Sequence, residues 1–245
     1  MFQPRTCSRL LLLAAMLGGA CSPSLEPIAV APDCPGNPFR GPEQFANEPA
    51  DRMLTDFEAD GTDNADGGTT DCTEKLDKIG GRDGYWGRAR DLTSQSVTMQ
   101  ASMACAARGK CAGHFATSTP TSWGNNWTAY LRSGAGPYDT SAYGGISFWA
   151  AFGANNGPSF AVPFGIVTTD TAPSSQVCGT NCGDDYMKGV PLTHDWQRYD
   201  LRFQDLAQGG WGAVQTPLRR DQVVGFIVWT KQQCDIWIDD LRFEP

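Results

Sequence analysis

Carboxylates interrupt two apolar stretches, one near each end of the chain. Residues 235–243 read Asp-Ile-Trp-Ile-Asp-Asp-Leu-Arg-Phe, and residues 54–61 read Leu-Thr-Asp-Phe-Glu-Ala-Asp-Gly. Burying a carboxylate in an apolar strand is costly unless it is paired or binds a cation. We therefore expect these acids at a sheet edge, at a rim or at a cation site, and we expect the two stretches to meet.

The C-terminal stretch has the composition of a β-strand, and alternation assigns its side chains to two faces. Asp239 and Asp240 are adjacent, so they diverge. Asp240 then shares a face with Ile238, whereas Leu241 shares the face of Asp239.

No residue pattern indicates catalysis. Glycoside hydrolysis needs two carboxylates about 5 to 10 Å apart, and no motif singles out such a pair among the acids. The two histidines, His114 and His194, are too far apart in sequence to suggest a metal pair. The Gly-x-Ser-x-Gly and His-Glu-x-x-His signatures are absent from the sequence. We expect no enzyme, with a polysaccharide-degrading activity as the alternative.

The N-terminus reads as an export signal. Arg5 and Arg9 precede the apolar residues 10–17, which are too few to span a bilayer, and small residues follow at 18–20. Cys21 then resembles the lipobox cysteine of bacterial lipoproteins, although Leu17 lies one position too far back. We expect export with a lipid anchor on Cys21, at the outer membrane or cell surface. The alternative is ordinary signal cleavage, which gives a secreted or periplasmic protein.

Nine cysteines in an exported chain indicate disulfides. The pairs close enough in sequence to bond without long-range assumptions are Cys105 with Cys111 and Cys178 with Cys182. A bond between Cys34 and Cys72 is a further possibility, which would leave Cys234 free. Zinc between Cys178 and Cys182 is disfavoured because no second cysteine or histidine pair stands nearby.

Composition describes one domain behind a tether. Residues 22–50 are rich in proline and lack periodicity, which is typical of a linker, and residues 51–245 form the domain. The net charge of −8 disfavours nucleic acid and anionic membrane surfaces, so the only membrane contact expected is the lipid anchor. Neutral ligands or cations fit the charge better.

Turn signals separate short apolar stretches throughout the domain, and the chain contains 28 glycines and 16 prolines. This pattern predicts an all-β sandwich or jelly roll of short strands. The acidic loop 60–71 lacks the closing glutamate of an EF-hand, so a solvated loop is expected there. The expected strands are 53–57, 97–101, 113–117, 123–131, 146–150, 160–169, 195–201, 223–229 and 235–243.

Motifs in this order resemble the galactose-binding-like jelly-roll domains, and among them the carbohydrate-binding modules of bacterial polysaccharide-degrading enzymes. The motifs lie at residues 56–58, 143–149, 182–186, 195–199, 203–206, 209–212 and 235–240. The resemblance implies a β-sandwich of two antiparallel sheets, with one sheet curved into a glycan-binding groove. It also implies a monomer.

The resemblance further implies a structural calcium ion that ties the first strand to the last. Glu58 and Asp239 match the family's ligands, and Asp240 and Asp60 are further candidates. Calcium suits such a site because it takes six to eight oxygen ligands. The alternative is that these acids are simply solvated at the rim.

Sugar recognition needs flat aromatic faces together with polar groups for the hydroxyls. Phe148, Phe226 and Val228 are expected in the core, and by alternation Trp149 faces away from Phe148, toward the groove. Each aromatic could also lie in the core; Trp196 and Trp237 are expected to be packed. The candidate ligand-binding residues are Trp149, Trp127, Trp123, Tyr130, Trp86 and Trp211.

These observations favour non-catalytic polysaccharide binding by an exported, calcium-containing, lipid-anchored domain. Besides the enzyme, one further alternative is a surface lipoprotein that uses the same aromatic face to bind a protein partner.

Overall fold

The structure is a computed structural model, and it describes residues 52–58, 72–91, 97–102, 105–107, 109–119, 122–153, 161–175, 177–212 and 217–245. The predictions for the export signal, Cys21, the tether, Cys34 and Asp60 lie outside these residues. Within them, no helix is long and apolar enough to cross a membrane.

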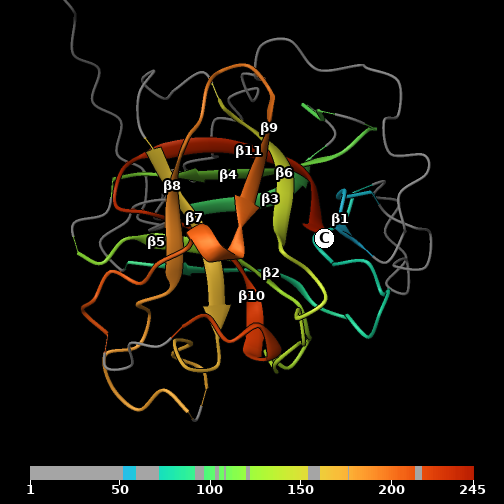
Figure 1. The fold of residues 1–245 in the computed structure, drawn as a ribbon. Helices are drawn as coiled ribbons and strands as arrows, with labels where there is room; N and C mark the ends of the chain where they lie inside the picture. The colour runs from blue at the N-terminus through green and yellow to red at the C-terminus, as the bar shows by residue number, and fades with distance from the viewer. Residues whose placement is uncertain are drawn as a thin grey trace, which may run out of the picture. The chain divides into compact units, whose positions relative to one another are not determined.

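The described strands form two antiparallel sheets (Figure 1). The six-stranded sheet has the order β3-β4-β11-β6-β9, with β1 paired to β11, and the five-stranded sheet has the order β2-β5-β10-β7-β8. The strands of the first are β1 (Met53–Thr55), β3 (Val97–Ser102), β4 (Ala112–Thr117), β6 (Gly145–Phe152), β9 (Gln197–Arg202) and β11 (Cys234–Glu244). Those of the second are β2 (Tyr85–Arg90), β5 (Asn125–Tyr130), β7 (Ala161–Thr168), β8 (Tyr186–Pro191) and β10 (Val223–Thr230).

The inner faces of the two sheets share one hydrophobic core. Phe148 of β6, Phe164 of β7 and Phe226 of β10 are buried there, and the Phe148 and Phe164 ring centroids lie 4.7 Å apart. Alternation along each strand sends every second side chain into this core. The predicted all-β sandwich and the core positions Phe148, Phe226 and Val228 are confirmed.

A β-bulge in β11 changes the predicted faces of the last strand. The register shifts between Asp239 and Arg242, and Asp240 has a positive φ of 49°. One extra residue reverses the alternation beyond it. Leu241 therefore lies in the core with Ile238, and the prediction that Leu241 shares the outward face of Asp239 is wrong.

The disulfides are partly as predicted. Cys178 is bonded to Cys182, which confirms that pair. Cys111 is bonded to Cys72, so the predicted Cys105–Cys111 bond and the possible Cys34–Cys72 bond are wrong. Cys105 is also disulfide-bonded. Cys234 is a free, buried thiol.

Two strands have no counterpart among the predicted ones. Strand β2 reads Tyr-Trp-Gly-Arg-Ala-Arg, and β8 reads Tyr-Met-Lys-Gly-Val-Pro. Both lie at the edges of the five-stranded sheet. Edge strands tolerate glycine and proline because one side of their backbone needs no partner, so their sequence signal is weak. The short 3-10 helices η3 (Phe203–Asp205) and η4 (Arg220–Gln222) complete the described elements.

Candidate functional site

A pair of tyrosines lies on the outer face of the five-stranded sheet. Tyr85 of β2 and Tyr130 of β5 stand opposite each other in the register, with ring centroids 5.8 Å apart and planes tilted by 46°. Tyr85 is 45% exposed, and Tyr130 is half-buried. Their neighbours Trp86 and Ala129 point into the core, so alternation turns both tyrosines outward.

Glycines keep the sheet surface beside the tyrosines low. Gly225 of β10 lies opposite Tyr130, and Gly87 of β2 lies next to it on the same face. A Cβ atom added to Gly87 would lie 2.8 Å from Cε2 of Tyr130, so the tyrosine ring lies over this glycine. Gly165 of β7 continues the low surface opposite Ile227. These three glycines place no side chain on the outer face next to the two rings.

Polar and aromatic groups line the same face toward the other end of β5. Asn126 and Thr128 share the face of Tyr130 by alternation, and Trp229 of β10 stands opposite Asn126. The ammonium group of Lys231 lies 5.4 Å from the Trp229 ring centroid. Tyr130 and Asn126 are four residues apart, which spans about 13 Å along the strand. This face therefore offers ring surfaces and amide or hydroxyl groups over more than the width of one sugar ring.

Asp185 is a buried carboxyl at the end of the tyrosine row. Ile166 stands opposite Tyr186, so continuing the register puts Asp185 beside Val167, in the row that contains Tyr130 and Gly225. The side chain is 7% exposed, and its Oδ1 atom has no hydrogen-bond partner among the described residues. Burial raises its pKa to about 7, the Thr171 hydroxyl counteracts this, and the charge of Asp184 raises the pKa further.

The pKa of Tyr130 also depends on its surroundings. Burial raises the pKa of Tyr130, with smaller contributions from the neighbouring Tyr85 and from the charge of Asp185, whereas a hydrogen bond with Thr128 lowers it. Tyr130 stays a neutral phenol at physiological pH, with a hydroxyl able to donate a hydrogen bond.

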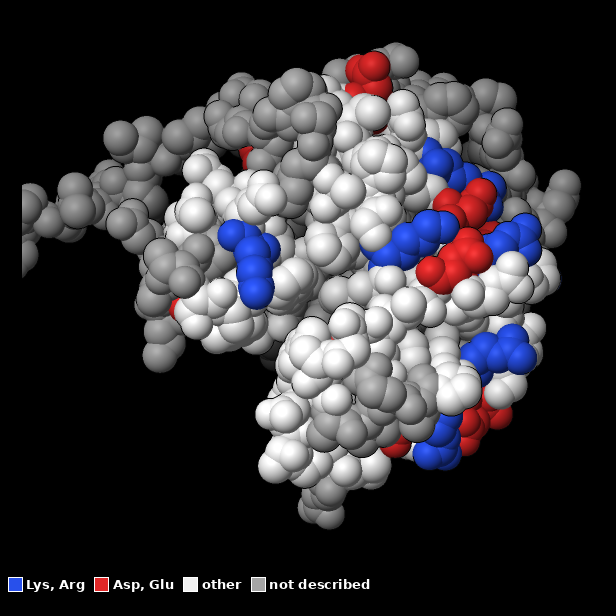
Figure 2. Space-filling view, turned by 60° about the vertical axis from the view of Figure 1, so that its left-hand side comes forward, with Lys and Arg blue, Asp and Glu red and all other residues white. Residues whose placement is uncertain are grey.

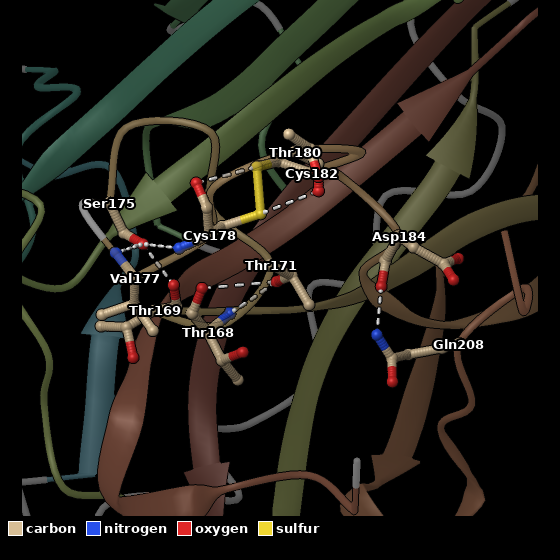
Figure 3. The surroundings of a disulfide bond; sticks show 10 residues. All are labelled: Thr168, Thr169, Thr171, Ser175, Val177, Cys178, Thr180, Cys182, Asp184 and Gln208. Atoms are coloured by element: carbon tan, nitrogen blue, oxygen red, sulfur yellow. Dashed lines mark hydrogen bonds between the residues drawn. A yellow bond between two sulfur atoms is a disulfide. The ribbon is translucent and has the colours of Figure 1, made fainter. Parts of the chain in front are cut away.

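Asp184 holds the loop that carries Trp211. Its buried carboxylate accepts backbone N–H bonds from Gly209 at 2.7 Å, Gly210 at 2.9 Å, Trp211 at 3.1 Å and Gly212 at 2.9 Å. The Gln208 amide also donates to the carbonyl oxygen of Asp184 at 2.9 Å (Figure 3). These four hydrogen bonds to one buried carboxylate fix the loop, because a displaced loop would lose them.

The Cys178–Cys182 disulfide orders the segment before Asp184 (Figure 3). The Ser175 hydroxyl accepts a 3.1 Å bond from the Cys178 backbone N–H and donates to the carbonyl oxygen of Thr169. These contacts connect the disulfide loop to the end of β7. They position Asp184 and Asp185 where the chain enters β8.

A second aromatic group lies on the outer face of the opposite sheet. Trp149 of β6 packs there against the buried Trp196 and Trp237, and the His114 ring stacks on Trp237 with centroids 4.1 Å apart. His114 also contacts the Asp235 carboxylate at 2.8 Å. Trp196 and Trp237 are packed, as predicted. Trp149 therefore lies on the opposite side of the sandwich from Tyr130.

The predicted ligand-binding aromatics do not gather at one place. Trp86 is 2% exposed and Trp127 is fully buried, so both are core residues and their assignment to a ligand site is wrong. Trp123 is 44% exposed before β5, at the opposite end of that strand from Tyr130, and Trp211 is 60% exposed in its loop.

Sequence reasoning missed Tyr85 and did not single out Asp185. Alternation could have found the tyrosine: once Trp86 is assigned to the core, its neighbour must face outward. No pattern marks the burial of Asp185, because that depends on how the loops before β8 pack.

The predicted calcium ligands have other partners in the structure. Oε1 of Glu58 accepts N–H bonds from Lys110 and from Cys111, and Oδ2 of Asp239 accepts one from Ala107 at 2.9 Å. Asp240 is buried 3.6 Å from Arg242. Among the described residues no group of three or more His, Cys, Asp or Glu side chains could hold a metal ion. Asp60 lies outside them, so the calcium site stays a prediction.

Charge is unevenly distributed on the side shown in Figure 2, which brings forward the left-hand side of Figure 1, where β8 is labelled. Basic and acidic side chains gather there with both signs interleaved toward the right, and most of the other described surface in view is uncharged. Lys188 of β8 and Asp205 form one surface ion pair, with an N–O distance of 3.0 Å. A largely uncharged surface suits a neutral ligand.

Comparison with solved structures finds the same fold in the family 11 carbohydrate-binding module from Clostridium thermocellum, in complex with a β-1,3-1,4-mixed-linked tetrasaccharide. The TM-score is 0.52 at 14% identity, covering 79% of this chain and 94% of that chain. A family 30 carbohydrate-binding module gives 0.48 at 16% identity, over 64% and 80% of the two chains. The family 30 module of a cellulosomal cellulase of Clostridium thermocellum gives 0.44 at 16% identity, over 65% and 90%.

No protein-family model and no curated protein sequence matches the chain. The likeness to the family 11 module confirms, at the level of the fold, the predicted resemblance to carbohydrate-binding modules.

Proposed function

We propose that the protein binds a neutral polysaccharide without catalysis, on the outer face of its five-stranded sheet. The observation that carries the proposal is the pairing of the exposed Tyr85 with the half-buried Tyr130 beside glycines that place no side chain on that face. Sugar rings present apolar C–H faces that stack on aromatic rings, and their hydroxyls need polar partners such as Asn126. The fold shared with a carbohydrate-binding module supports the same proposal.

The proposed face differs from the one that the sequence favoured through Trp149. Trp149 packs against the buried Trp196 and Trp237, so less of its ring is available to a ligand. Tyr85 is 45% exposed instead, and its ring neighbours that of Tyr130. We therefore assign ligand binding to the outer face of the five-stranded sheet, which carries Tyr85 and Tyr130 and is called the tyrosine face below. A Trp149→Ala variant tests whether the six-stranded sheet binds the ligand instead.

Affinity electrophoresis on a set of soluble polysaccharides tests the proposal. We expect at least one polysaccharide to retard the wild type, and we expect Tyr85→Ala and Tyr130→Ala to lose most of the retardation. Trp149→Ala should be retarded like the wild type. If Trp149→Ala alone abolishes retardation, the binding face lies on the six-stranded sheet. If no polysaccharide retards the wild type, the carbohydrate proposal fails.

Assay of the same polysaccharides for released reducing ends separates binding from hydrolysis. We expect no release, because no pair of carboxylates is singled out on the proposed face.

We also propose that the protein is exported and anchored through Cys21, as the N-terminal sequence predicts, which would place the binding face outside the cytoplasm. Metabolic labelling with a fatty acid, compared between the wild type and Cys21→Ser, tests the anchor.

A further inference from the structure

Trp211 is an exposed indole on a loop that is held unusually firmly. The side chain of Trp211 is 60% exposed. Its backbone N–H and the backbone N–H groups of three neighbouring glycines nevertheless all donate to the buried Asp184 carboxylate. The ring lies close to Gly183 and Gly209: added Cβ atoms there would lie 3.6 Å from its Cη2 and 3.0 Å from its Cδ1. An aromatic ring fixed against glycines, with much of its surface in solvent, is prepared for stacking at little entropic cost.

The loop of Trp211 begins at the edge of the proposed binding sheet. Ala207 pairs with Met187 on the free side of β8, so the chain extends the sheet there before it reaches Trp211. Met187 packs in the outer-face cluster that also includes Tyr130. On the other side of the contact, Gly183 lies only two residues before Asp185, which stands in the same cross-strand row as Tyr130. Trp211 therefore stands next to the end of the tyrosine row.

We propose that Trp211 is a second stacking platform continuous with the tyrosine face, so that the ligand is a neutral oligosaccharide chain lying across the strands. This inference rests on the proposed function and names the class of ligand for that site. The row from β2 to β8 crosses four strand spacings, about 19 Å, before the loop begins. A single sugar cannot contact both ends of such a row, whereas a chain of several rings can.

Asp184 is the positioning residue of this platform. Its two carboxylate oxygens accept all four loop N–H bonds, and an amide in its place would turn an NH2 group toward some of these donors. Asp184→Asn should therefore loosen the loop and weaken chain binding without touching the ligand. Faster amide hydrogen exchange at residues 209–212 would report that loosening directly.

Calorimetric titration with oligosaccharides of increasing length tests the inference. The first probes are mixed-linked gluco-oligosaccharides, as di-, tetra- and hexasaccharides, followed by the same lengths cut from the polysaccharide that retards the wild type most. Trp211→Ala should lower the affinity for the hexasaccharide about tenfold, equivalent to about 1.4 kcal/mol, and leave the disaccharide unchanged. Tyr130→Ala should lower the affinity for every length.

The matched control is Trp123→Ala, because Trp123 is also exposed but precedes the opposite end of β5. It should not change the dependence of affinity on chain length. A loss in Trp211→Ala that is equal at all lengths, or no loss at any length, would overturn the inference while leaving the proposed function intact. Absence of wild-type binding to every oligosaccharide and every polysaccharide would overturn both.

Discussion

Glu58 and Asp239 accept hydrogen bonds from one backbone segment, although they are separated by most of the domain. Glu58 accepts from the N–H groups of Lys110 and Cys111, the latter at 2.8 Å, and Asp239 accepts from Ala107 at 2.9 Å. The start and the end of the domain are thus joined through residues 107–111. The Cys72–Cys111 disulfide reinforces the junction, because the backbone of Cys72 also pairs with that of Glu58 in an isolated antiparallel β-bridge.

Removing either carboxylate should destabilise the domain. Glu58→Ala or Asp239→Ala leaves backbone N–H groups of residues 107–111 without acceptors, and each lost charged acceptor costs about 1 to 3 kcal/mol. Urea unfolding measures the free energy of unfolding directly. Asp200→Asn is the control, because its side chain is 65% exposed in a surface ion pair worth little. A loss no larger than that of the control would contradict the structural role.

The calcium prediction for Glu58 and Asp239 has a separate test. An ion that binds only the native state adds stability, so a chelator should lower the melting temperature of the wild type. Glu58→Gln should abolish the difference between chelator and added calcium. A wild-type melting temperature that does not respond to chelator would leave the two carboxylates as hydrogen-bond acceptors alone.

The bulge at Asp240 makes a stability prediction of its own. Asp240 adopts a left-handed backbone, which aspartate tolerates better than alanine, and its carboxylate lies 3.6 Å from the buried Arg242 guanidinium. Asp240→Ala removes one member of this buried ion pair, and breaking a buried ion pair costs about 3 to 5 kcal/mol. The same substitution in an Arg242→Met background should cost markedly less. Equal costs in both backgrounds, measured by urea unfolding, would show that the ion pair does not contribute.

Most strands were predictable because alternation and turn residues are local signals. Phe148 and Phe226 could be assigned to the core in this way. The β11 bulge could not, since one inserted residue reverses every later side chain and leaves no mark in composition. The Cys72–Cys111 bond was missed for a related reason: it joins segments that only the paired sheet brings together.

The candidate site was less predictable than the fold. The aromatic content indicates sugar stacking, but the exposure of each ring depends on the register of its strand. Trp86 was a candidate ligand-binding residue because glycine-rich turns lie beside it, whereas alternation in β2 buries it and exposes Tyr85. The position of Trp211 depends on Asp184, a contact between loops that no short motif describes.

Gly87 should be needed for the position of the Tyr130 ring. An alanine there would bring a Cβ atom to 2.8 Å from Cε2 of the ring, which must move outward. We expect Gly87→Ala to weaken polysaccharide retardation. The free energy of unfolding should stay within about 1 kcal/mol of the wild type, because alanine is otherwise more favourable than glycine inside a strand. Gly189→Ala in β8 is the control, since its added atom would meet only Ala161 at 3.3 Å. Equal retardation of both variants would argue against the ring position.

Asp185 should make the domain less stable as the pH rises. Its pKa is about 7 in the native state, against about 3.9 in an unfolded chain, so between these values the native state binds more protons. Stability from this group is therefore fully present below about pH 4 and is lost progressively as the pH rises to about 7. Asp185→Asn imitates the neutral acid and removes this loss. The variant should be more stable than the wild type at pH 8, by at most roughly 4 kcal/mol, and nearly equal to it at pH 4.

Urea unfolding of the wild type and Asp185→Asn across this pH range measures the difference free of other titrating groups. Asp200→Asn, at an exposed carboxylate, should show no comparable gain at pH 8. An Asp185→Asn variant that is less stable than the wild type at pH 8 would mean that the carboxylate is paired in the native state. The Oδ1 atom has no hydrogen-bond partner among the described residues, so we expect the opposite result.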